Sequence, residues 1–144
     1  MTRDDVYIDK TAEVHESATI GAGSSIWNWT KVREQVFIGN NCNIGQVAFT
    51  NDLYPRAGNS DWTVTRTRVE DGVSIGANAT IICGVTLGTN CMIGAGDVVT
   101  KDVPAHGLVV GQPARLVGYV SCSGRPLNHD MECGHPPDSA KLEA

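Results

Sequence analysis

The chain has 144 residues and a mass of 15.3 kDa, which suits a single domain. Hydrophobic residues make up 41% of it and charged residues 19%, so neither a disordered chain nor a polyelectrolyte is expected. The formal net charge of −5 argues against nucleic acid or a membrane surface as a partner. No apolar run reaches membrane-spanning length and the first residues lack a secretory signal, so we expect a cytoplasmic protein.

Aliphatic residues recur at every sixth position over most of the chain. One series is Ile8, Val14, Ile20, Ile26, Val32, Ile38 and Ile44, and a second is Val69, Ile75, Ile81, Leu87, Ile93 and Val99. A period of six fits neither a helix nor an ordinary strand, but it fits a short strand and a corner, repeated. Three such sides make one coil of about eighteen residues, and stacked coils bury the aliphatic column. The pattern predicts an all-β parallel β-helix of hexapeptide repeats with about four to five coils.

A second column of small or medium residues lies two positions before the aliphatic one. Its members are Ala12, Ala18, Ser24, Val36, Cys42, Ala48, Val73, Ala79, Val85 and Cys91. Cys42 and Cys91 are therefore expected to be inert core thiols. The corners need residues that tolerate positive φ, and Asn40, Asn41, Asn78 and Asn90 fit these places.

The repeat breaks once, between Ile44 and Val69, which are separated by one residue more than a multiple of six. Ala48 is expected to stay in phase, but Thr50 does not continue the aliphatic series. We predict that residues 50–62 leave the coils as a loop and that residues 63–68 form a weak further rung. Loops on rigid scaffolds often carry functional residues, although a tolerated surface insertion has the same pattern. The predicted organisation is a domain over residues 1–120 and an irregular tail or cap over 121–144.

Several segments resemble the hexapeptide-repeat acyltransferases, in particular the branch that N-acetylates nucleotide-linked amino sugars. These segments are FTNDLYPRA, SIGANATIICGVTLGTNCMIGAGDVVTKDVPAHGLVVGQPARLVG, TAEVHESATIGAGSSIWNWTKVRE and IGNNCNIGQ. The resemblance extends from Val6 to Val120 and implies a left-handed coil, a homotrimer and acetyl-CoA as cosubstrate, with no metal required. The chain departs from the family by lacking about two coils between NCNIGQ and the loop, where family members carry residues of the sugar pocket.

The resemblance also implies roles for the loop residues. The Asn of the TND motif lies beside the acceptor in this family, so Asn51 is the candidate that holds the acceptor amine through its amide oxygen. Asp52 is a second catalytic candidate, either as proton acceptor or by holding the loop. Tyr54 and Arg56 are candidates for binding the sugar or its phosphates. The loop contains no histidine, which favours an amine acceptor over an alcohol.

The C-terminal coils are expected to bind CoA. The candidate residues are Ala77, Gly84, Gly94, Ala95, Lys101 and Arg115. The two alanines would let the pantetheine arm lie against the backbone, and an amide of one of the glycines would donate to the oxyanion. Lys101 and Arg115 match basic positions that meet CoA phosphates in the resembling family, although each is also an ordinary surface charge.

Other functions remain open from the sequence. The loss of coils is compatible with a non-catalytic scaffold that still binds CoA, and a different amine or hydroxyl acceptor is a further alternative. Cys122, His129, Cys133 and His135 could bind zinc, but they lack a CxxC pair. A zinc site of three imidazoles on successive coils is disfavoured because the repeats before Val99 contain only His15.

Overall fold

The computed structural model describes residues 5–127, which form strands, turns and one long loop. The strands are β1 (Tyr7–Ile8), β2 (Glu13–Val14), β3 (Thr19–Ile20), β4 (Ser25–Ile26), β5 (Lys31–Val32), β6 (Val36–Ile38), β7 (Asn43–Ile44), β8 (Ala48–Phe49), β9 (Thr67–Val69), β10 (Ser74–Ile75), β11 (Thr80–Ile81), β12 (Thr86–Leu87), β13 (Met92–Ile93), β14 (Val98–Val99), β15 (Gly107–Gly111), β16 (Ala114–Val120) and β17 (Pro126–Leu127). Within these residues there is no helix that is long and apolar enough to cross a lipid bilayer.

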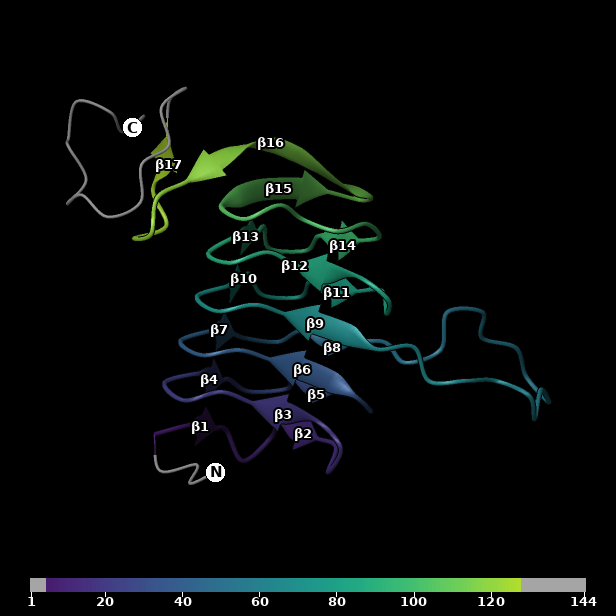
Figure 1. Cartoon of the computed structure of the whole chain (residues 1–144). Coiled ribbons are helices and arrows are strands. Elements are labelled where there is room, and N and C mark those ends of the chain that lie inside the picture. Colours follow the sequence, from purple (N-terminus) through teal and green to yellow (C-terminus); the bar gives the residue numbers. More distant parts are fainter. Residues whose placement is uncertain (1–4, 128–144) are drawn as a thin grey trace.

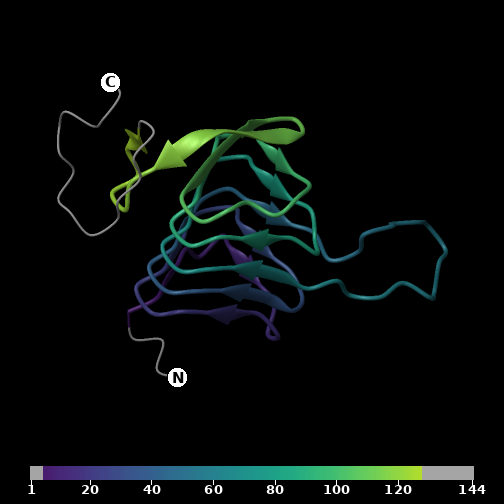
Figure 2. The ribbon, with the colours of Figure 1, turned by 45° about the horizontal axis from the view of Figure 1, so that its top comes forward.

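The strands form three sheets that are the faces of one prism (Figures 1 and 2). The first sheet has the order β1-β4-β7-β10-β13-β15-β16-β17, the second β14-β11-β8-β5-β2 and the third β12-β9-β6-β3. Strands from successive coils pair in parallel, as Tyr7 with Ser25 and Ile8 with Ile26. In Figure 1 the strands of the third sheet, β3, β6, β9 and β12, lie nearest the viewer and run from right to left. The chain rises from its N-terminus at the same time, so the coil is left-handed, as predicted.

The predicted aliphatic column forms the core. From Ile20 onward every member of both series is buried, and Ile26, Ile38 and Ile44 have no exposed surface. The corners bear out three of the four predicted asparagines, since Asn41, Asn78 and Asn90 have φ of 56°, 63° and 59°. Asn40 occupies the same corner as Asn41 but is not among the residues with positive φ.

The prediction for Ala48 was wrong, because the corner before it is one residue short. Gln46 takes the left-handed conformation at φ 52°, and Val47 and Phe49 are buried at 1% and 2% exposure. Phe49 pairs with Ile81 in the second sheet and so replaces an aliphatic residue in the inward column. Ala48 lies between them on the exposed side. The irregular spacing therefore comes from a shortened corner followed by a loop.

The stack is slightly taller than the four to five coils predicted, with about six turns. The first sheet contains parallel strands from six successive levels, β1, β4, β7, β10, β13 and β15. The weak rung predicted over residues 63–68 is not a separate side, because residues 63–66 are not in a strand and Thr67 and Arg68 belong to β9 with Val69. One additional side is β8, where Phe49 continues the inward column after the repeat was predicted to break. Another arises because Val103 and Val109 remain buried after Val99.

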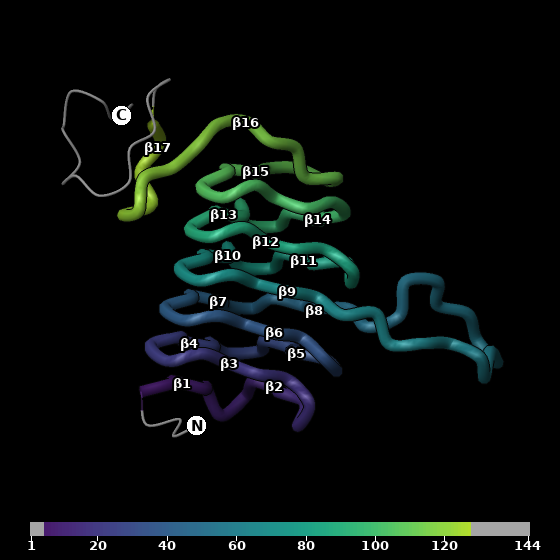
Figure 3. Tube along the Cα trace, in the orientation of Figure 1, coloured from purple at the N-terminus to yellow at the C-terminus, as the bar shows by residue number. Residues whose placement is uncertain are grey.

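The loop between β8 and β9 projects from the stack at the corner between the second and third sheets (Figure 3). At the C-terminal end β15 and β16 form an antiparallel hairpin, and β17 pairs with β16.

The predicted zinc-ligand candidates His129, Cys133 and His135 lie outside the described residues. Among residues 5–127 no group of three or more potential metal-binding side chains is found.

Candidate functional site

The corner from which the loop leaves brings together residues that follow three stacked strands. His15 follows β2, Arg33 and Glu34 follow β5, and Asn51 follows β8 after one intervening residue. Lys31 pairs with Ala48 across β5 and β8, seventeen positions away because of the short corner. Extending this register by three residues sets Glu34 opposite Asn51.

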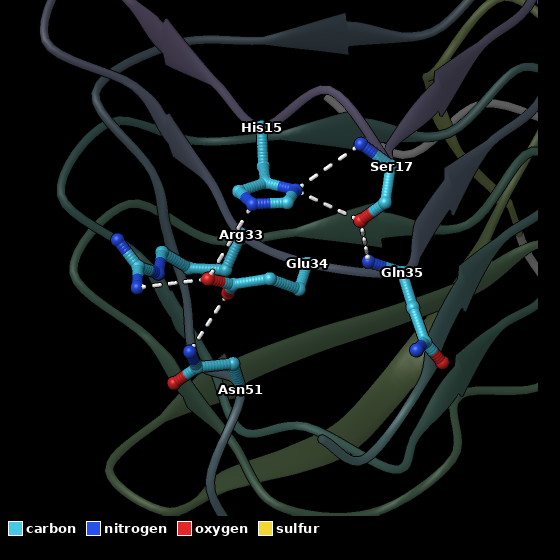
Figure 4. Close-up of polar contacts among 6 residues, drawn as sticks. All are labelled: His15, Ser17, Arg33, Glu34, Gln35 and Asn51. Carbon is cyan, nitrogen blue, oxygen red and sulfur yellow. Dashed lines mark hydrogen bonds and ion pairs between the residues drawn. The ribbon is translucent and has the colours of Figure 1, made fainter.

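Glu34 is the centre of the polar contacts at this corner (Figure 4). Asn51 Nδ2 donates a hydrogen bond to Glu34 Oε2 over 2.7 Å. Arg33 Nη2 lies 3.2 Å from Oε1 of the same carboxylate, and His15 Nε2 lies 3.8 Å from that atom. The carboxylate thus faces one amide, one guanidinium and one imidazole, which come from three successive coils.

The ring of His15 is held from its other side. The backbone N–H of Ser17 donates to His15 Nδ1 over 3.1 Å, and Ser17 Oγ lies 2.8 Å from the same nitrogen. Ser17 Oγ in turn accepts the backbone N–H of Gln35 at 3.0 Å. Because a backbone N–H is only a donor, the neutral ring accepts at Nδ1 and carries its proton on Nε2, toward Glu34.

The pKa of Glu34 is lowered from its ordinary value. A hydrogen bond from its own backbone N–H is the largest cause, and the Asn51 amide, Arg33 and His15 act in the same direction against a partial loss of hydration. The group is therefore ionised at neutral pH and is a weak base. Its effect is to fix the amide of Asn51, because a carboxylate accepts only from the NH2 side and leaves Oδ1 for another donor.

Asn51 and Glu34 line an open cleft of about 540 Å³, together with residues of the loop. It is lined by Arg33, Glu34, Asn51, Asp52, Pro55, Arg56, Ala57, Asn59 and Trp62. Three of the predicted loop residues, Asn51, Asp52 and Arg56, therefore share one cleft. Tyr54 does not line it and is 79% exposed. Asp52 Oδ1 accepts the backbone N–H of Tyr54 at 3.0 Å, a contact that shapes the loop.

The two basic residues expected to meet CoA phosphates also lie together. Lys101 follows β14 and Arg115 lies on β16, and both line a cleft of about 230 Å³ with Pro104 and Leu116. They are fourteen residues apart in the chain, and the antiparallel hairpin of β15 and β16 brings them together. The hexapeptide period does not predict this contact, because the hairpin lies beyond the repeats.

The remaining candidates are divided between two corners. Gly84 lies at the corner of Asn51, whereas Ala77, Gly94 and Ala95 lie at the corner between the first and second sheets. The amide of Gly84 donates to the Arg66 carbonyl at 3.0 Å. The amide of Gly94 donates to the Val109 carbonyl at 3.0 Å and to Asp97 Oδ2 at 2.8 Å. Both amides are thus engaged within the protein, which argues against the oxyanion role suggested for them.

Glu34 was not among the residues predicted from the sequence, and His15 was considered only as a possible zinc ligand. The signal for His15 is its spacing, since positions 15, 33 and 51 are each eighteen apart, which is the length of one coil. That spacing alone would set Arg33 beside Asn51. The short corner at Gln46 replaces Arg33 with Glu34, and no sequence period reveals this shift.

Comparison with known proteins agrees with this architecture. Residues 66–101 match the family model described as the hexapeptide repeat of succinyl-transferase. A serine acetyltransferase of Bacillus pumilus is 34% identical over 128 residues, which are 88% of this chain and 55% of that protein. The dTDP-3-amino-3,6-dideoxy-alpha-D-galactopyranose 3-N-acetyltransferase of Aneurinibacillus thermoaerophilus is 53% identical over 55 residues, which are 38% of this chain and 29% of that protein.

Solved structures show the same relationship. The serine acetyltransferase of Neisseria gonorrhoeae has a TM-score of 0.63 and 33% identity, covering 76% of this chain and 41% of that one. A hexapeptide-repeat acetyltransferase of Vibrio cholerae has a TM-score of 0.71 and 27% identity, covering 80% and 70%. The chain spans 28% to 30% of the length of the first curated relatives that it matches. Its hexapeptides, its three-sided coil and these similarities show that the chain belongs to the hexapeptide-repeat acyltransferase family.

Proposed function

We propose that the protein transfers the acetyl group of acetyl-CoA to the amino group of a nucleotide-linked sugar. The observation that carries this proposal is the hydrogen bond from Asn51 to Glu34, which leaves the amide oxygen of Asn51 to accept an N–H of the acceptor. The similarity to a dTDP-amino-sugar N-acetyltransferase over 55 residues supports the same acceptor class.

The reaction needs little acid–base assistance from the protein. A neutral amine held by Asn51 attacks the thioester carbonyl, and collapse of the tetrahedral intermediate forms the amide and breaks the C–S bond. The proton lost by the nitrogen neutralises the departing CoA thiolate. Positioning of the two reactants supplies most of the rate enhancement. In this assignment Tyr54 and Arg56 contact the sugar, Lys101 and Arg115 hold CoA phosphates, and Ala77 and Ala95 border the pantetheine arm.

A homotrimer would complete this site. The Asn51 cleft is open to solvent, and the loop carries exposed apolar side chains that the single chain does not cover. Leu53, Tyr54 and Trp62 are 41%, 79% and 45% exposed. A neighbouring subunit packed against the loop would bury these groups and exclude water from the cleft.

A hydroxyl acceptor is the second candidate, because a serine acetyltransferase is similar over 88% of this chain and the solved structure of another covers 76% of it. Attack by a hydroxyl needs a general base, and His15 is the one histidine near Asn51 among the described residues. Both ring nitrogens of His15 are directed at protein groups, however: Nδ1 at Ser17 and Nε2 at Glu34. This arrangement favours the amine acceptor.

The test is thiol release from acetyl-CoA with UDP- and dTDP-amino sugars, L-serine and maltose as acceptors. Release with an amino sugar, lost in Asn51→Ala, supports the proposal. Release only with serine or maltose establishes the hydroxyl acceptor and overturns it. Binding of CoA by calorimetry with no release from any acceptor establishes the non-catalytic scaffold instead.

A further inference from the structure

A second groove lies on the other side of the loop base, over the outer surface of the third sheet. Its volume is about 500 Å³. It is lined by Ser17, Thr19, Gln35, Val36, Phe37, Arg66, Thr67, Arg68, Gly84, Val85 and Thr86. We call it the arginine groove. Two of these described residues are arginines and none is acidic, although the chain as a whole has a net charge of −5. Arg68 is ion-paired with Glu70, whose carboxylate lies just outside the groove, whereas Arg66 is paired only with the neutral amide of Gln35. The groove therefore keeps one uncompensated positive charge, which favours an anion.

The two guanidiniums are anchored in a similar way. Arg66 Nε donates to Gln35 Oε1 over 2.9 Å, and Arg68 Nε donates to Glu70 Oε1 over 2.8 Å. Arg68 also lies over the ring of Phe37, at 4.4 Å from the centroid. Within residues 5–127 neither guanidinium makes a further hydrogen bond, so both terminal amino groups of each remain as donors. A fixed planar fork with free terminal donors suits the oxygens of a phosphate.

The arginine groove begins directly beside the acceptor site. The backbone N–H of Thr65 donates to the Asn51 carbonyl at 2.9 Å, so the two ends of the loop lie side by side. Arg66 is the next residue on the returning end. On the preceding coil, Glu34 lines the Asn51 cleft and Gln35, its neighbour in the chain, lines the groove. A ligand with its amine at Asn51 can therefore extend over the loop base into the groove.

We propose that the arginine groove binds the diphosphate of the nucleotide-linked acceptor, an inference that rests on the proposed function. The reaction has two substrates and each carries a diphosphate, since CoA contains one as well. The chain offers two separate basic sites, and Lys101 and Arg115 line a different cleft from Arg66 and Arg68. The groove beside the Asn51 cleft is therefore assigned to the sugar nucleotide, and the cleft of Lys101 and Arg115 to CoA.

The experiment measures binding of UDP, dTDP and CoA to the full chain by isothermal titration calorimetry. The test variant is Arg66→Gln with Arg68→Gln. The matched control is Lys10→Gln with Lys31→Gln, which removes two positive charges from residues that are exposed and line neither basic site. A third variant, Arg66→Lys with Arg68→Lys, keeps the charges but loses the planar forks, and thermal melts of every variant check that it is folded.

The expected result is a loss of affinity for UDP or dTDP of roughly tenfold or more in the Gln pair, because each charge-assisted contact is typically worth that much. The Lys pair should be intermediate, and CoA affinity should stay within about twofold in all variants. Loss of CoA affinity instead would assign the groove to CoA and overturn the inference. Unchanged UDP and dTDP affinity in the Gln pair, or no binding by the unsubstituted chain, would also overturn it.

The proposed function can fail independently. If the Gln pair loses UDP or dTDP but no amino sugar is ever acetylated, the groove assignment stands and the acetyl transfer does not. If amino sugars are acetylated with the same KM by the Gln pair and the unsubstituted chain, the acetyl transfer stands and the groove assignment does not.

Discussion

The side chain of Asn51 donates to Glu34 Oε2 over 2.7 Å. This bond fixes which end of the amide remains available, because a carboxylate accepts hydrogen bonds and cannot donate them when ionised. In the proposed reaction Asn51 would accept an N–H of the acceptor, and Glu34 would be its positioning residue.

Removal of Glu34 should impair turnover more than cosubstrate binding. In Glu34→Ala the amide of Asn51 is free to rotate, and we expect kcat to fall by about tenfold, the cost of one misplaced hydrogen bond. The KM for acetyl-CoA should change by less than about twofold. Glu34→Gln is the matched control, because its side-chain oxygen can still accept from Asn51 and should retain most of kcat. Steady-state kinetics of both variants would show this, and equal kcat for Glu34→Ala and the unsubstituted protein would contradict it.

Substitution of Asn51 itself should have a larger effect on turnover. Asn51→Ala removes the acceptor for the substrate N–H, and we expect kcat to fall by about a hundredfold, as for loss of a key transition-state contact. The Kd for CoA, measured by calorimetry, should be unchanged because Lys101 and Arg115 line another cleft. An unaltered kcat would remove Asn51 from the mechanism.

The contribution of Glu34 to stability should depend on pH. Its pKa is below the ordinary value of 4.5 in the folded protein, so its stabilising contribution is present above pH 4.5 and is lost as the pH falls through the folded-state pKa. Urea unfolding of the unsubstituted protein and of Glu34→Gln between pH 7 and pH 3 tests this. The difference in unfolding free energy should be largest at neutral pH and should vanish at the acid end. A difference that grows on acidification would contradict the assignment.

The core cysteines should be unreactive while the protein is folded. Burial raises the pKa of the Cys91 thiol to about 12, and burial also raises the pKa of Cys42. In a background with Cys122→Ser and Cys133→Ser, the remaining Cys42, Cys83 and Cys91 are all buried. An aromatic disulfide reagent should titrate none of them quickly in native buffer and all of them in urea. Rapid labelling of the native protein would show that the coils open readily.

Phe49 should be among the most sensitive core positions. It is 2% exposed and fills the place that the aliphatic column would otherwise occupy. Phe49→Ala should lower the free energy of unfolding by about 3–5 kcal/mol, because it leaves a cavity in a narrow core. Phe37→Ala is the control, since Phe37 is 38% exposed on the outer face. Urea denaturation that gave the same loss for both would contradict the assignment of Phe49 to the core.

The period of six predicted the architecture because each coil repeats the same physical demand. An inward aliphatic residue and a corner residue with positive φ are needed at every side, so Ile26, Ile38 and Asn41 could be placed from the sequence alone. The grouping of Asn51 with Asp52 and Arg56 also followed from the break in the period. These features are local in the chain, or repeat at a fixed interval.

The features that the sequence did not reveal depend on a change of register. Phe49, Glu34 and Ala48 were missed or misplaced because one residue is absent from a corner, and the spacing gave no sign of where. Arg66 and Arg68 were missed because their neighbours Gln35 and Phe37 lie on the coil below, beyond the loop. These pairings can be predicted only when the length of the loop between the two coils is known. The hexapeptide pattern does not give that length.

The shortened corner at Gln46 also has a consequence for protein engineering. In the regular turns the chain advances by eighteen residues, as from Tyr7 to Ser25, whereas from Lys31 to Ala48 it advances by seventeen. The turn that contains the loop is longer, and the last one, from Met92 to Leu108, is sixteen. Whole turns from a related enzyme could therefore be transplanted on either side of Gln46 as eighteen-residue cassettes. A cassette that includes Gln46 must be one residue shorter. With eighteen residues the inward and outward positions of the strand that follows would be exchanged. Chimeras of the protein should therefore place their junction at this corner, so that neither half has to accommodate the missing residue.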